Sequence, residues 1–280
     1  MESHKKLMSA LALAVMVGAT QVPSAEALTV STTNDANVLA SNILGSGITL
    51  VGSASYSGGS TASGTFTNGG NIGMASGILL TSGSAALAQG PNNVGNAGLS
   101  NGAPGYTPLN ALIPGYSTYN ASVLSFNFTT KGGDLFFNYV FGSEEYNEWV
   151  GSPYNDVFAF FLDGKNIALI PGTSTPVSIN NVNNGKNSAY FRDNTNGAFN
   201  TQYDGLTTVL TATALALAEG QHHIDIAIAD TSDTYWDSGV FIQAGTFSDT
   251  PTPTVPEPST FVLLGLGLAG VGLARRRSKK

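Results

Sequence analysis

The sequence predicts an all-β protein: an antiparallel β-sandwich or jelly-roll-like domain, with an N-terminal signal helix and a short hydrophobic C-terminal helix. Segments rich in Val, Ile, Phe and Tyr, such as "DLFFNYVFGSEEY", "DVFAFFLDG" and "HHIDIAIAD", recur at intervals typical of antiparallel strands. Their side chains alternate, because Ile224, Ile226 and Ile228 share one strand face while His223 and Asp225 share the other. Gly, Asn and Ser separate these segments, as expected of turns.

Residues 1–27 have the pattern of a secretory signal peptide. Lys5 and Lys6 precede the apolar run "LMSALALAVMVGAT", and the small residues Ala25 and Ala27 mark a cleavage site after Ala27. We therefore expect the chain to be exported by the Sec machinery.

The body of the chain, residues 28–255, is acidic and free of cysteine. It has four basic and 15 acidic residues, which gives a net charge of −11. Nucleic acid is excluded as a partner, because its phosphates require clustered Lys and Arg. The charge suits divalent cations or simple solubility. Without disulfides, the fold must be stabilised by an apolar core.

The first half of the body is less clearly patterned than the second. Short apolar pulses such as "GITLVGSASYSG" and "ASGILLTSG" predict strands and turns, and "NGAPGYTPLNALIPGY" predicts a loop with one short helical turn. The stretch "LTATALALAEG" fits either a strand or a short helix. We expect one domain over residues 28–248 and a Pro/Thr linker over 249–254, because proline lacks the N–H that a sheet needs.

Residues 255–280 combine three features in a fixed order. A Pro-Glu-Pro triplet comes first, the fourteen apolar or glycine residues 261–274 follow, and a basic cluster ends the chain. The residues that define the motif are Pro256, Glu257, Pro258, Arg275, Arg276 and Arg277. This order resembles the PEP-CTERM sorting signal of Gram-negative bacteria.

The resemblance implies recognition by an exosortase, an integral-membrane transpeptidase-like enzyme, and cleavage near the triplet. A spanning helix needs about 20 apolar residues, so the stretch at 261–274 is short. We therefore expect transient anchoring in the inner membrane, with the basic cluster on the cytoplasmic side, and then release to the cell surface or medium. A permanent transmembrane helix is the alternative.

The body also resembles a known family. The segments "GSEEYNEWVGSPYNDVFAFFLDG", "NIALIPGTSTPVSINNVN", "YDGLTTVLTA" and "IAIADTSDTYWDSGVFIQAGTF" are similar to the choice-of-anchor L domain. The similarity extends from about residue 28 to residue 247. The family pairs one exported domain with various C-terminal anchors, which implies a binding or structural component of the cell surface or extracellular matrix.

Acidic residues within these motifs predict a Ca²⁺ site. Asp156 and Asp230 fall at the ends of apolar strand faces, where an unpaired carboxylate is unfavourable. Ca²⁺ prefers carboxylate and amide oxygens. The predicted ligands are Glu145, Asn155, Asp156, Asp230, Asp233 and Asp237. The alternative is that these carboxylates accept hydrogen bonds from backbone N–H groups in turns.

Aromatic residues lie beside the same acids in the sequence. Tyr146, Trp149, Tyr235 and Trp236 are candidate glycan contacts, which makes a Ca²⁺-dependent carbohydrate-binding module, with exopolysaccharide as ligand, an alternative function. The rings could equally close the loop ends of the core.

Catalysis is the less favoured alternative. A polysaccharide hydrolase needs an acid and a base whose carboxyl groups are about 5–9.5 Å apart. Such a pair could be formed by Glu144 or Glu145 with Asp156 or Asp230. The chain has no H-E-x-x-H motif. We therefore assign no catalytic residue and expect a protein that is not an enzyme.

Overall fold

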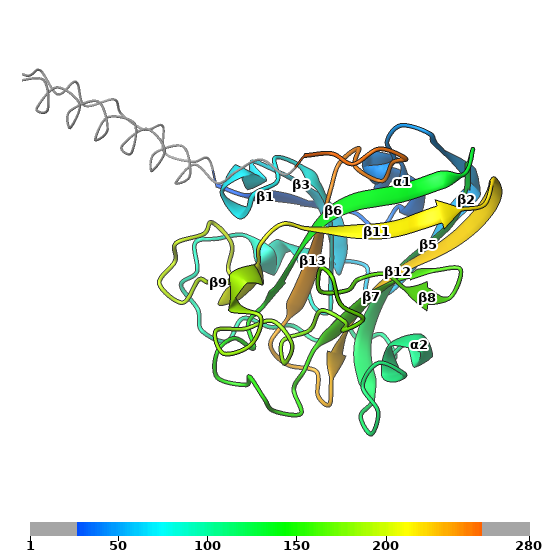
Figure 1. Cartoon of the computed structure of the whole chain (residues 1–280). Coiled ribbons are helices and arrows are strands. Elements are labelled where there is room, and N and C mark those ends of the chain that lie inside the picture. The colour runs from blue at the N-terminus through cyan, green and yellow to red at the C-terminus, as the bar shows by residue number, and fades with distance from the viewer. Residues whose placement is uncertain (1–26, 254–280) are drawn as a thin grey trace, which may run out of the picture.

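The computed structural model describes residues 27–253 and confirms the predicted antiparallel β-sandwich (Figure 1). The first sheet has eight strands in the order β1-β3-β4-β13-β6-β10-β9, with β11 also pairing with β6. Their bounds are β1 Thr29–Thr32, β3 Ser63–Thr67, β4 Gly77–Thr81, β6 Gly133–Ser143, β9 Phe191–Asp193, β10 Gly205–Thr207, β11 Leu210–Leu217 and β13 Ser238–Gln243. The second sheet has the order β2-β5-β12-β7-β8. Its strands are β2 Ile48–Ser57, β5 Thr118–Thr130, β7 Val157–Leu162, β8 Lys165–Asn166 and β12 Gly220–Thr231.

Short helices connect the strands. They are α1 Ala36–Ile43, α2 Thr107–Asn110 and the 3₁₀ turns η1 Gly69–Ile72, η2 Ala85–Ala88 and η3 Ser188–Tyr190. The turn α2 confirms the helical turn expected there, and β11 shows that the ambiguous "LTATALAL" is a strand. The interpretation of the first half as strands and turns alone was wrong at α1. Asp35 caps this helix, because its Oδ1 accepts hydrogen bonds from the backbone N–H groups of Asn37 and Val38 at 2.9 and 3.2 Å.

The main core lies between the two sheets. Ile224, Ile226 and Ile228 of β12 are fully buried in it, which confirms the predicted inner face of that strand. Ile226 pairs in register with Phe160 of β7 on one side and Leu124 of β5 on the other. Apolar residues also cover the outer faces of both sheets, so strands near the centre of each sheet are buried on both sides.

The segment that follows β13 is held against the main core. We call residues 244–252 the C-terminal clasp. Its Phe247 is fully buried, with ring centroids 5.0 and 5.1 Å from those of Phe128 and Phe137. Backbone N–H groups of Gly245 and Ser248 donate to the carbonyls of Asn42 and Phe136, each at 3.0 Å.

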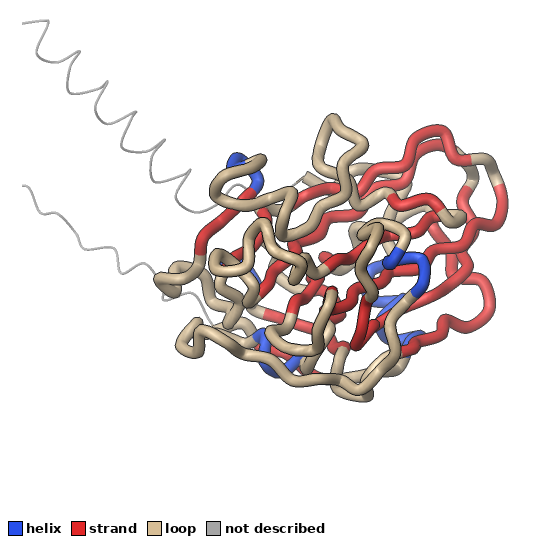
Figure 2. Tube along the Cα trace, turned by 90° about the horizontal axis from the view of Figure 1, so that it is seen from below, coloured by secondary structure: helices blue, strands red, loops and turns tan. Residues whose placement is uncertain are grey.

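Two loops cross between the sheets at the same end of the sandwich. Residues 144–156 connect β6 of the first sheet to β7 of the second, and residues 232–237 connect β12 of the second sheet back to β13 of the first. Because β7 pairs with β12 and β6 pairs with β13, the two crossings are held close together. We call them the crossover loops. Figure 2 shows that the long loops gather on one side of the molecule, whereas the strands extend on the other.

The predicted signal peptide and sorting segment lie outside the described residues. Within residues 27–253, no helix is long and apolar enough to cross a membrane. The predicted domain boundaries and the cleavage after Ala27 stay predictions.

Candidate functional site

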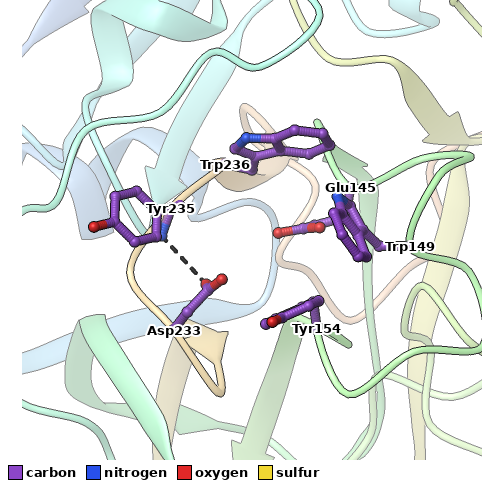
Figure 3. A pocket seen from close by; sticks show the side chains of 6 residues that line it. All are labelled: Glu145, Trp149, Tyr154, Asp233, Tyr235 and Trp236. Atoms are coloured by element: carbon purple, nitrogen blue, oxygen red, sulfur yellow. Dashed lines mark hydrogen bonds between the residues drawn. The ribbon is translucent and has the colours of Figure 1, made fainter.

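The two crossover loops enclose a pocket of about 190 Å³ (Figure 3). The first loop contributes one acid and two rings, and the second loop does the same. The lining residues are Glu145, Trp149, Tyr154, Asp233, Tyr235 and Trp236. Every charged residue in this lining is acidic.

The rings form walls set at steep angles to one another. The centroids of Trp149 and Tyr154 are 5.0 Å apart with an interplanar angle of 82°, and those of Trp149 and Trp236 are 5.8 Å apart at 68°. Trp149 is 37% exposed and Tyr235 is 70% exposed. These rings therefore present faces and edges to solvent instead of filling the core.

Glu145 places a buried carboxyl group in this pocket. The residue is only 2% exposed, and Figure 3 shows its carboxylate pointing into the space between Trp236 and Tyr154. Its Oε2 atom has no hydrogen-bond partner among the described residues. Burial and then the negative charge of Asp233 raise the pKa of Glu145 to about 9. Burial also raises the pKa of Asp233, whose Oδ1 accepts a hydrogen bond from the Tyr235 N–H at 3.3 Å.

Asp156 and Asp230 are fully buried at the strand ends next to these loops. Asp156 accepts hydrogen bonds from the Thr231 N–H at 2.9 Å and the Ser238 hydroxyl at 2.7 Å. Asp230 accepts one from the Asn120 amide at 2.8 Å, while its Oδ1 has no partner among the described residues. Burial, followed by repulsion from neighbouring carboxylates, raises the pKa of both groups well above the ordinary aspartate value.

Glu144 and Asp237 belong to a neighbouring acidic patch. Burial, and then the charge of Asp204, raises the pKa of Glu144 to about 9, and its Oε2 accepts from the Ala97 N–H at 3.3 Å. Asp237 accepts from the N–H groups of Ser84 and Leu99 at 3.1 and 2.9 Å, and burial raises its pKa to about 6. These contacts have the form of the backbone-capping alternative to metal binding.

The structure divides the predicted Ca²⁺ ligands among different places. Glu145 and Asp233 line the pocket. Asp156, Asp230 and Asp237 are instead buried in the protein, where each accepts hydrogen bonds from neighbouring groups. Asn155 lies elsewhere: its Oδ1 accepts from the Asn180 N–H at 2.8 Å, and it borders a separate depression with Pro153 and Tyr116. Among residues 27–253, no three His, Asp or Glu side chains are arranged to hold a metal ion.

The candidate glycan contacts also divide. Trp149, Tyr235 and Trp236 line the pocket. Tyr146 does not, because it is fully buried and its hydroxyl donates to the Val182 carbonyl at 2.7 Å. Its assignment as a surface contact was wrong, since a ring in the core cannot reach a ligand.

Two further residues complete the site. Tyr154, which lies beside the same glutamates in the aromatic and acidic segment "EEYNEWVGSPYND", forms a wall of the pocket. Asn120 holds Asp230 from β5 and has a positive φ of 51°. Asparagine tolerates this conformation better than most residues, but its position in an ordinary strand pattern gives no signal of it.

Comparison with known proteins yields two matches. A family model for the choice-of-anchor L domain matches residues 28–248, and a model for the PEP-CTERM protein-sorting motif matches residues 254–277. No curated protein and no solved structure matches the chain. The second match indicates export and sorting to the cell surface, with exosortase as the enzyme that recognises the motif.

Proposed function

Because the chain belongs to the choice-of-anchor L family and ends in a PEP-CTERM sorting motif, we propose that it is a binding or structural component of the cell surface or extracellular matrix. The observation that carries the proposal is the order of the two parts, a β-sandwich over residues 28–248 followed at once by the sorting motif at 254–277. In this proposal Sec exports the chain, the tail holds it briefly in the inner membrane, and exosortase releases it.

The sorting step is tested by changing the triplet in the native host. Pro256→Ala combined with Glu257→Ala should leave full-length protein in the inner membrane, because exosortase no longer recognises the motif. Mass spectrometry of membrane and released fractions measures the outcome. Ser259→Ala, next to the triplet, is the matched control and should be processed normally. Trimming and release of the double variant at the wild-type level would contradict the proposal.

A second candidate is a Ca²⁺-dependent carbohydrate-binding module with exopolysaccharide as ligand. The observation that favours it is the pair of buried oxygens, Asp230 Oδ1 and Glu145 Oε2, that lack hydrogen-bond partners among the described residues. Ca²⁺ would have to draw these carboxylates together, since they are not arranged as a ligand set. Such a rearrangement is the physical cost of this candidate.

Thermal unfolding with Ca²⁺ and with EDTA tests that candidate. Ca²⁺ at 100 times its dissociation constant should stabilise the fold by about 2.7 kcal/mol through linkage. Asp230→Asn should abolish this gain, whereas Asp35→Asn should keep it, because asparagine also caps α1. Equal midpoints across millimolar Ca²⁺ would contradict metal binding and favour the capping interpretation.

A polysaccharide hydrolase is the weakest of the three. Asp156 and Asp230 have no exposed surface, so a substrate would not reach an acid–base pair that included either. Glu145 and Asp233 are the acids that line the pocket.

A further inference from the structure

We propose that the pocket between the crossover loops binds a small organic ammonium ion, held against the faces of Trp149, Tyr154, Tyr235 and Trp236 by the carboxylates of Glu145 and Asp233. The ligand is a quaternary N-methylated head group or a free amino group, and the chemistry that these share is a positively charged nitrogen. The site does not depend on how the chain is sorted.

The aromatic walls are the first argument. A cation is attracted to the electron-rich face of an aromatic ring, most strongly to tryptophan. Four rings line this one pocket, and Trp149 meets Tyr154 and Trp236 edge to face instead of in parallel stacks, so the rings lie in several orientations around the space. An enclosure of rings in several orientations is the arrangement that recognises quaternary ammonium groups.

The carboxyl groups are the second argument. Glu145 is almost fully buried, yet its Oε2 has no hydrogen-bond partner among the described residues. A buried polar atom in this state is unfavourable unless a ligand satisfies it. An ammonium N–H would donate to this oxygen, and a positively charged nitrogen bound beside it would favour the ionised form of Glu145 that burial opposes. Asp233 faces the same space from the opposite loop (Figure 3).

The size of the pocket is the third argument. A volume of 190 Å³ corresponds to about six water molecules at liquid density. This is smaller than the roughly 300–1,000 Å³ of typical drug-sized sites, so it suits one small head group. Ca²⁺ would make no use of the four rings, and it requires six to eight oxygen ligands where the pocket offers two carboxyl groups.

Tryptophan fluorescence of the purified full chain tests the proposal directly. The chain has two tryptophans, and both line the pocket, so all of the tryptophan emission reports on it. Choline chloride should change the emission saturably, whereas its uncharged carbon analogue 3,3-dimethylbutan-1-ol should not. Glucosamine and the uncharged N-acetylglucosamine form the corresponding pair for a free amino group. The charged member that binds more tightly identifies the source, and sodium chloride at equal concentration controls for ionic strength.

Variants of pocket residues, compared with variants of nearby residues outside the pocket, test whether the cation binds in the pocket. Tyr235→Ala and Glu145→Gln should each weaken binding about tenfold or more. Tyr235 is largely exposed, so its loss leaves the fold intact and keeps the test valid. The matched controls are Tyr116→Ala, which removes an exposed ring from the neighbouring depression, and Glu148→Gln, which removes an exposed charge from the same loop. Both should bind as wild type does.

Three results of the titrations with wild-type protein would overturn the proposal. The first is no saturable change with any ammonium probe, and the second is equal binding of the charged and neutral members of both pairs. The third is a response to calcium chloride that ammonium probes do not compete with. Unchanged binding in both Tyr235→Ala and Glu145→Gln would likewise place the cation elsewhere.

Discussion

Glu144 shows how burial of one side chain makes the stability of the fold depend on pH. Its pKa is raised from the ordinary 4.5 to about 9, first by burial and then by the charge of Asp204. Between these two values the folded state binds more protons than the unfolded state, so the free energy of unfolding falls as pH rises. The contribution of the protonated Glu144 to the free energy of unfolding is fully present below about pH 4.5, and it is lost as the pH rises through about 9.

We expect Glu144→Gln to reduce this loss. Glutamine stays neutral at every pH, so the variant should lose less stability than wild type between pH 5 and 9, by up to about 1.4 kcal/mol per pH unit. Urea unfolding at pH 5, 7 and 9 measures the difference. Glu148→Gln, an exposed residue of the same loop, should follow the wild-type curve. Parallel curves for Glu144→Gln and wild type would show that Glu144 is ionised in the fold.

At this scale the sequence predicted residue types better than contacts. Alternation along the strands correctly placed Asp156 and Asp230 at the ends of buried faces. It could not show that Asn155 turns toward Asn180, because loop geometry has no period to follow. The same is true of Tyr146, which enters the core from a loop instead of a strand.

The strand β12 makes the predicted inner face testable. Ile226 is fully buried between β5 and β7, so Ile226→Ala should leave a cavity and cost about 2–5 kcal/mol of unfolding free energy. Chemical denaturation measures it. Leu215→Ala on β11, where the side chain is 67% exposed, should change stability by less than about 0.5 kcal/mol. A near-neutral effect of Ile226→Ala would mean that the isoleucine face is not the packed one.

The element that escaped prediction is α1, and its signal is present in the sequence. Its buried residues are Ala36, Leu39, Ala40 and Ile43, which follow the helical spacing of three and four, and Asp35 stands at the N-cap. The helix has only eight residues, and it lies in a region rich in Gly, Ser, Thr and Asn. The composition of this region is typical of strands and turns. The helix is stabilised instead by packing of its buried residues against the main core.

At the scale of the whole molecule, the sandwich was predictable but the path of the chain through it was not. Periodicity shows that a strand has an inner face, and it does not show which sheet the strand joins. The crossover loops exist because β6 and β13 pair in one sheet while β7 and β12 pair in the other. These pairings join residues 62 to 103 positions apart in the sequence, and a single sequence gives no local signal for them. The pocket depends on both pairings, so only its residue types could be foreseen.

The C-terminal clasp also decides how a mechanical load enters the domain. A pull on residue 253 reaches Phe247 and the backbone bonds around it before it reaches β13. Beyond them, β13 lies in the interior of its sheet and pairs with both β4 and β6, so tension on it is resisted by two ladders together. The clasp therefore bears tension first, at the end of the domain where a surface tether would attach. The crossover loops lie at the opposite end of β13, so tension reaches them only after the clasp and the two ladders of β13.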